Sequence, residues 1–187
     1  ERDYDYTSAV FGEDLDSPQQ VGASAAERTL SRLGPQKPAT GQFPVVYHQR
    51  VAGSLVGTLA GAINGAAIAR GTSFLKDSMG EQITSPGLTF IDDPLRPRGM
   101  ASRLFDGEGL AVSRRAMVED GVLKNWFLDI ASATKLGLAP TGQAARGMGS
   151  SPTPGSSNFY LENGDISFEE LIADIEEGFL VTEMMGS

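Results

Sequence analysis

The segment between Arg50 and Arg70 constrains the fold more than any other part of the chain, because its nineteen residues, 51–69, carry no charge. Glycine recurs there at every fourth position, and leucine or isoleucine recurs at the same spacing two positions out of step. Two positions on a helix are about 200° apart, so the two sets fall on opposite faces. The pattern predicts one buried helix over residues 51–69 whose glycine face is formed by Gly53, Gly57, Gly61 and Gly65.

Hydropathy alone would allow a membrane span over residues 51–69, but the composition argues against one. Ten of the nineteen residues are glycine or alanine, and only six are valine, leucine or isoleucine. Each of those six contributes only a few tenths of a kcal/mol toward insertion. Each glycine costs roughly 1 kcal/mol relative to alanine inside a helix. We therefore expect no membrane partner, and we expect another helix or strand to pack closely against the glycine face.

The remaining segments indicate short strands, tight turns and capped helices. Helices are predicted between Ser17-Pro18 and Gly34-Pro35 and after the capping box of Ser167 and Glu170. Strands are predicted at residues 43–47, which we expect to be buried, and at 88–91, 158–162 and 179–182. A hairpin is predicted over 111–129 with its turn at Asp120-Gly121. Residues 140–157 are predicted to form a long loop. The predicted fold class is α+β: an antiparallel sheet with hairpins, one central Gly/Ala-rich buried helix and peripheral amphipathic helices.

Composition and charge narrow the possible functions. The chain has no cysteine and one histidine, which excludes a thiolate zinc site and any site that needs two imidazoles from one chain. Residues 1–20 carry six acids and one base, and residues 158–187 carry eight acids and no base. The bases in between are scattered and have no aromatic residues among them, so we expect no nucleic-acid partner. The absence of cysteine fits a cytoplasmic protein best.

Three groups of residues are candidate sites of chemistry. His48 follows a predicted strand, but no nucleophile-elbow pattern accompanies it, so a surface position is favoured. Asp92 and Asp93 are neighbours and would point to opposite faces of a strand, which makes them a poor acid/base pair; a solvated loop is favoured over a cation site. The segment 141–147 holds one cation among small residues and could cradle an anion or a peptide backbone.

Taken together, the motifs resemble the TldD/PmbA family, whose members are also labelled modulators of DNA gyrase, and specifically its PmbA (TldE) branch. The resemblance covers nearly the whole chain and rests on ERTLSRLG, PVVY, AGAINGAAIARGTSFLKDSMGEQI, GLTFIDDP, FDGEG, VEDGVLKNWFLD, PTGQAARG, FYLENGD and EGFLVTEMMGS. Family members are about twice as long. The resemblance therefore implies a single fragment of a larger protein, which comprises the central helix region (about 17–80) and most of a β-rich C-terminal domain (about 81–187).

The resemblance also implies a function. The family pairs two homologous subunits in a cytoplasmic heterodimer with metalloprotease activity on peptides and unfolded substrates, and the TldD branch carries an H-E-x-x-x-H zinc motif before an R-G-T-S turn. Arg70-Gly71-Thr72-Ser73 matches that turn here. Counting back from it without gaps places the three motif positions at Val56, Gly57 and Gly61. None of these side chains can bind zinc or act as a base.

Two functions therefore remain open. The first is a non-metal-binding PmbA/TldE-type subunit that contributes to proteolysis or peptide maturation by binding a metal-bearing TldD-type homologue, which carries the zinc, and an extended peptide substrate. The second is an independent enzyme, with a site outside this fragment or around His48 and Asp92, or a regulatory protein of the gyrase-modulator label. No cofactor and no catalytic residue are expected in this chain. The candidates for peptide binding or packing are Gly57, Gly61, Arg70, Thr141, Gly142 and Arg146.

Overall fold

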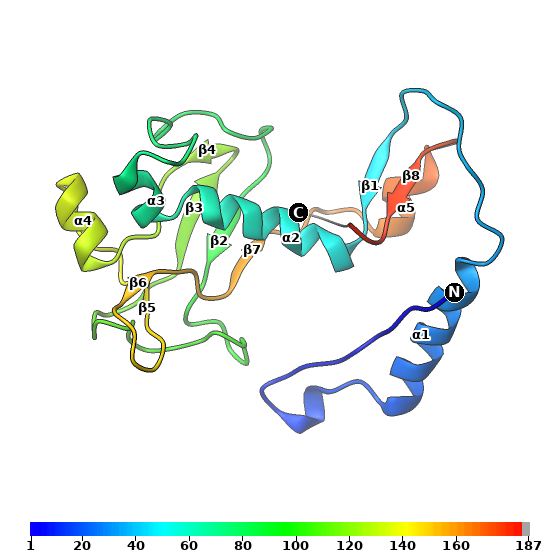
Figure 1. The fold of residues 1–187 in the computed structure, drawn as a ribbon, viewed down its shortest axis with the longest axis horizontal. Helices are drawn as coiled ribbons and strands as arrows, with labels where there is room; N and C mark the ends of the chain where they lie inside the picture. The colour runs from blue at the N-terminus through cyan, green and yellow to red at the C-terminus, as the bar shows by residue number, and fades with distance from the viewer. Residues whose placement is uncertain (185–187) are drawn as a thin grey trace. The chain divides into compact units, whose positions relative to one another are not determined.

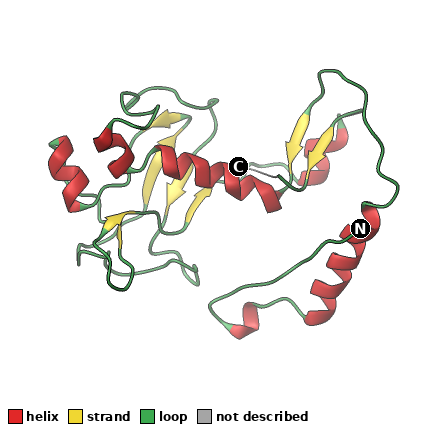
Figure 2. Cartoon of the chain, in the orientation of Figure 1, coloured by secondary structure: helices red, strands yellow, loops and turns green. Residues whose placement is uncertain are grey.

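The computed structural model describes residues 1–184, and the chain divides into two compact units, Glu1–Gln42 and Phe43–Ser187 (Figures 1 and 2). Residues 185–187, which end the motif EGFLVTEMMGS, lie outside the described residues. Within the described part, no helix is both long enough and apolar enough to cross a bilayer.

The first unit is built on one helix. Helix α1 spans Pro18–Ser31 and follows a short 3-10 helix, Gly12–Asp14. As predicted, Ser17 caps this helix, and a capping box forms, because the Ser17 hydroxyl accepts a hydrogen bond from the Gln20 amide and the Ser17 amide donates one to Gln20 Oε1. Ion pairs from Arg28 to Asp5 at 2.8 Å and from Arg32 to Asp3 at 3.2 Å hold the N-terminal segment to this helix. The predicted helix is confirmed.

The second unit contains the main sheet. Strands β2 (Phe90–Asp92), β3 (Arg115–Glu119), β4 (Val122–Leu123) and β7 (Phe159–Leu161) lie in the order β4-β3-β2-β7, and each neighbouring pair is antiparallel (Figure 1). The core beside this sheet includes Ile63, Met117, Val118, Leu123 and Phe127, which are all nearly inaccessible to solvent. The α+β class with an antiparallel sheet is confirmed.

The predicted hairpin forms, but its arms are shorter than expected. Asp120 and Gly121 have φ angles of 49° and 77°, the backbone that a two-residue turn matching the strand twist requires. The Lys124 amide just after β4 still donates to the Met117 carbonyl in β3, but the Phe127 amide donates to the Ile63 carbonyl at 3.1 Å. From Phe127 on, the chain therefore pairs with the central helical segment and does not extend the hairpin.

The central helical segment is broken, so the prediction of one buried helix over residues 51–69 was wrong. Helix α2 spans Gln49–Ala62 and helix α3 spans Gly65–Arg70. Asn64 separates them because its side-chain oxygen accepts from the Ala66 amide at 3.0 Å and caps α3, while its Nδ2 donates to the Pro154 carbonyl at 2.9 Å.

The glycine face is also open where we expected close packing. Gly53, Gly57 and Gly61 are exposed, and a Cβ added to any of them would meet nothing within 4 Å in the part of the chain that the structure describes. Gly65 alone in the series is closely packed, against Phe127, Leu128 and Ser132. The expected packing partner for the face of α2 that carries these three glycines is therefore not among the described residues.

The smaller elements complete the unit. Strands β1 (Val45–Tyr47) and β8 (Phe179–Val181) form a parallel pair beside helix α5 (Phe168–Ala173), which has the predicted capping box. Both ends of β1 are exposed, so the expectation of a buried strand was wrong. Helix α4 (Ile130–Leu136) was not predicted, although Asp129 caps it and Gly137 ends it with a left-handed backbone. Strands β5 (Ala144–Ala145) and β6 (Thr153–Pro154) form a short hairpin within the predicted loop.

Candidate functional site

A groove of about 970 Å³ lies between α2 and β7. Helix α2 crosses the sheet near this strand (Figure 1). The groove is lined mainly by apolar and small residues of these two elements, among them Gly53, Val56, Gly57, Phe159 and Leu161. It is the largest of the pockets described here, and it is our candidate functional site.

The helical wall of the groove is unusually bare. On one side of α2, Val56, Leu59 and Ala60 pack against the core next to Phe159. Gly53 and Gly57 line the groove without a side chain, and their exposed backbone lets another chain approach the helix axis closely. Each glycine lowers the stability of the helix relative to alanine, and no described residue packs against this face to offset that cost. Close contact with the backbone of a bound chain would offset it.

The opposite wall is the edge of the main sheet. The Asp93 amide donates to the Asn158 carbonyl at 3.0 Å, and the Glu162 amide donates to the Thr89 carbonyl at 2.9 Å, so the backbones of alternate residues face β2. In an antiparallel ladder the residues between them point the other way. The peptide groups of Phe159 and Leu161 therefore face away from β2, at the outer edge of the sheet. Such an edge offers donors and acceptors to an added strand.

A buried carboxylate positions the start of β7. Asp92 is fully buried, and its Oδ1 accepts from the Ser157 amide at 2.7 Å and the Ser157 hydroxyl at 3.0 Å. Its Oδ2 accepts from Gln143 Nε2 at 2.7 Å. Ser157 lines the groove, so this network ties β2 and the loop before β5 to the groove wall. The expectation that Asp92 lies in a solvated loop was wrong, because three hydrogen bonds compensate for its burial.

The structure separates the residues predicted as a site. Val56 and Gly57 line the groove, whereas Gly61, one turn further along α2, does not. Arg70 lies exposed at the end of α3, and Arg146 is exposed beyond β5.

Two other predicted residues have roles in packing. Thr141 accepts a hydrogen bond from the Leu128 amide at 3.0 Å and donates one to the Leu128 carbonyl at 3.1 Å. Gly142 has a φ of 73° and packs against the Ala111 carbonyl. These contacts fit the packing alternative of the prediction for Thr141 and Gly142, and binding of an anion or a peptide by this loop stays a prediction.

His48 has a structural task. It is the N-cap of α2, where its Nδ1 accepts from the Arg50 amide at 3.2 Å, and its ring lies 6.4 Å from that of Phe168. While His48 caps the helix, its Nδ1 lone pair is occupied by this hydrogen bond. The surface position favoured by the sequence is consistent with this arrangement.

The donor set does not fit a catalytic zinc ion. At the three positions that the resemblance aligns with the zinc motif stand Val56, Gly57 and Gly61, whose side chains have no ligand atom. Among residues 1–184, no group of three or more histidine, cysteine or acidic side chains is arranged to hold a metal. No chemical step is therefore assigned to a metal on this chain.

Sequence reasoning missed the residues that shape the groove most. Gln143 and Ser157 are far from Asp92 along the chain, and neither stands in a motif that signals a pair. The one available signal was Asp92 itself, an acid that directly follows the predicted strand at residues 88–91. A carboxylate that is buried at the end of a strand needs hydrogen-bond donors close to it. The unpaired edge of β7 depends on strand order, which periodicity does not reveal.

Comparison with known proteins places these observations in a family. Residues 40–187 match the model of the PmbA/TldA metallopeptidase C-terminal domain. The whole chain is 42% identical over 186 residues to the metalloprotease PmbA of Escherichia coli O157:H7 and covers 39% of that protein. A metalloprotease of Methanothermobacter thermautotrophicus is 36% identical over 161 residues, with 86% of this chain and 35% of the relative covered.

Solved structures share the fold. A proposed modulator of a DNA gyrase from Thermotoga maritima superposes with a TM-score of 0.86 at 31% identity, over 95% of this chain and 40% of that one. TldE from Thermococcus kodakarensis superposes with a TM-score of 0.82 at 26% identity, over 93% of this chain and 40% of that one. The chain thus spans about two fifths of the length of these proteins.

Proposed function

Because the chain belongs to the PmbA/TldD metallopeptidase family, we propose that it is part of a subunit that binds peptide but holds no catalytic zinc. The observation that carries the proposal is the occupancy of the motif positions: Val56, Gly57 and Gly61 stand where a metal-bearing homologue would have its ligands and base. In this proposal the α2–β7 groove binds an extended peptide, and a homologous TldD-type subunit supplies the zinc and the hydrolysis.

Peptide binding is supported by the two walls of the groove. An extended segment beside β7 would pair with the peptide groups of Phe159 and Leu161, and such strand addition recognises backbone and so tolerates many sequences. Its other side would lie against the bare helix at Gly53 and Gly57. A glycine-lined wall accommodates side chains of different size, as a protein acting on varied peptides requires.

The test uses the full-length protein, alone and mixed with a metal-bearing TldD-type homologue. We expect peptide cleavage only in the mixture, and less than 0.1 zinc per PmbA-type chain by elemental analysis, since a catalytic site needs about three ligands. Near one zinc per chain in the isolated protein, together with peptidase activity that chelation abolishes, would overturn the proposal.

The role of the groove is tested with two matched glycine variants. Gly57→Leu fills the groove, whereas Gly61→Leu adds the same side chain to an equally open position outside it. We expect Gly57→Leu to weaken peptide binding and cleavage by the mixture at least about tenfold, because about 1.4 kcal/mol of lost contact corresponds to that factor. Gly61→Leu should behave as wild type. Equal activity of both variants would show that the groove does not bind the peptide.

A further inference from the structure

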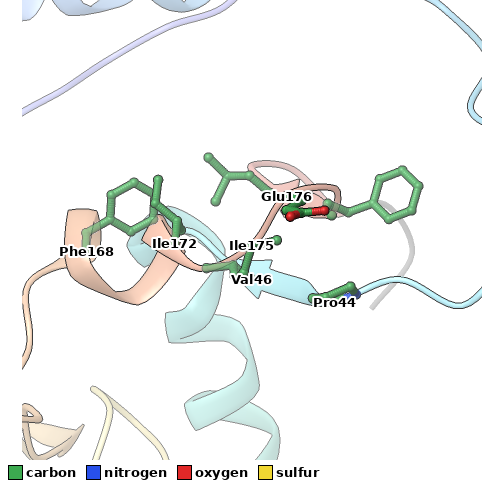
Figure 3. A pocket seen from close by; sticks show the side chains of 9 residues that line it. Pro44, Val46, Phe168, Ile172, Ile175 and Glu176 are labelled. Atoms are coloured by element: carbon green, nitrogen blue, oxygen red, sulfur yellow. The ribbon is translucent and has the colours of Figure 1, made fainter.

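A second pocket, away from the groove, lies between α5 and the strands β1 and β8 (Figure 3). It has a volume of about 280 Å³. We call it the α5 pocket, and its lining residues are Pro44, Val46, Phe168, Ile172, Ile175, Glu176, Gly178, Phe179 and Leu180. Eight of the nine are apolar or glycine, and Figure 3 shows the Glu176 carboxylate among the apolar side chains.

The apolar lining is incompletely covered. Phe168, Ile172 and Leu180 expose 40%, 37% and 47% of their surface. A two-stranded sheet such as β1–β8 buries too little to be stable by itself, and α5 adds less than two turns of helix. An apolar side chain inserted into the α5 pocket would remove these surfaces from water.

One acidic side chain, Glu176, lines the pocket, and the segment that forms much of its wall is rich in acids. Residues 158–187 carry eight acids and no base. Within the described part of the chain, no ion pair joins Glu169, Asp174, Glu176 or Glu177 to a cation. A ligand that offers a cation next to an apolar side chain would complement Glu176 and the apolar lining together.

We propose that the α5 pocket docks a cationic, amphipathic segment of another protein chain. An apolar side chain of that segment enters between Phe168, Ile172 and Leu180, and a lysine or arginine beside it pairs with Glu176. Long basic side chains suit this arrangement because their methylene stems cover apolar surface while the charged head stays in water. The site is separate from the α2–β7 groove and does not depend on the function proposed for it.

The experiment measures binding of labelled decapeptides to the full-length protein by fluorescence anisotropy at low salt. One peptide alternates leucine and lysine, and its counterpart alternates leucine and glutamate. We expect binding of the lysine peptide only, weakened by raised salt because the charges are exposed. Glu176→Gln should weaken it about threefold to fivefold. Glu177→Gln makes the same change in charge on a neighbouring residue outside the pocket and should have a clearly smaller effect.

A second readout locates the peptide. In protein with labelled isoleucine methyl groups, the lysine peptide should shift the signals of Ile172 and Ile175 and leave that of Ile63, which is in the core, unchanged. Equal binding of both peptides, equal effects of the two glutamine variants, or no binding at all would overturn the proposal. Shifts of Ile172 and Ile175 that follow protein concentration without peptide would also overturn it, because a second copy would then occupy the pocket.

Discussion

The Gly65 amide donates a hydrogen bond to the Phe127 carbonyl at 2.8 Å, and the two residues lie so close that a side chain on Gly65 would collide with that carbonyl oxygen. This contact joins the start of α3 to the chain that leaves β4. It requires the chain to interrupt the helix just before Gly65, at Asn64, which forms a bridge with Phe127. The break in the central helix is thus the position at which helix and sheet are joined.

The first prediction concerns that contact. Gly65→Ala should destabilise the protein by about 1–3 kcal/mol, because the added methyl group meets backbone and the side chains of Leu128 and Ser132 in a packed region. Gly61→Ala is the control, since its Cβ meets nothing within 4 Å in the described part of the chain. Urea unfolding of both variants measures the difference. Equal stability of the two would show that the junction relaxes more easily than its packing indicates.

The second prediction concerns the open glycines of α2. Gly57→Ala should stabilise the protein by up to about 1 kcal/mol, the difference in helix propensity, because no described residue opposes the methyl group. Gly53→Ala should act in the same direction, and thermal unfolding of the full-length protein checks both. A loss of stability would mean that another part of the full-length protein packs against this face, as we first expected from the sequence.

The third prediction concerns the buried carboxylate. Asp92→Ala should destabilise the protein by about 3 kcal/mol or more, because the Ser157 amide and Gln143 Nε2 lose their acceptor inside the protein. Asp93→Ala is the control, since within the described residues the Asp93 carboxylate accepts from the Leu95 amide, at 3.0 Å in an exposed turn, and the substitution should cost about 1 kcal/mol or less. Chemical unfolding measures both variants. Similar losses would contradict the role given to Asp92.

The fourth prediction concerns the start of α5. The Ser167 amide and hydroxyl hold the pKa of the Glu170 carboxyl below its usual range. Since the folded-state pKa is lowered, this interaction stabilises α5 above the carboxyl's ordinary pKa and is lost as the pH falls through the folded value. Ser167→Ala should move the pKa of Glu170 upward, toward its usual value, as followed by NMR titration. Ser54→Ala, which removes a hydroxyl bonded to the Val51 carbonyl, should leave it unchanged.

Local signals predicted local structure well. The capping residues Ser17 and Ser167 and the turn Asp120-Gly121 each act through neighbours within a few positions, and all three predictions are confirmed. The pattern of Gly53, Gly57 and Gly61 was equally regular, yet it predicted a buried face that is open in the described chain. Periodicity reports which residues share a face, but it does not report what covers that face.

The amino-acid sequence by itself determined the helix caps, the hairpin turn and the α+β class, because each depends on residue type and short spacing. Only the tertiary structure decided that Asn64 interrupts the central helix, that Asp92 is buried against Ser157 and Gln143, and that β7 borders a groove. These features join residues that are far apart along the chain. The free energy of such contacts depends on burial and on available partners, which a residue acquires only when the chain is folded.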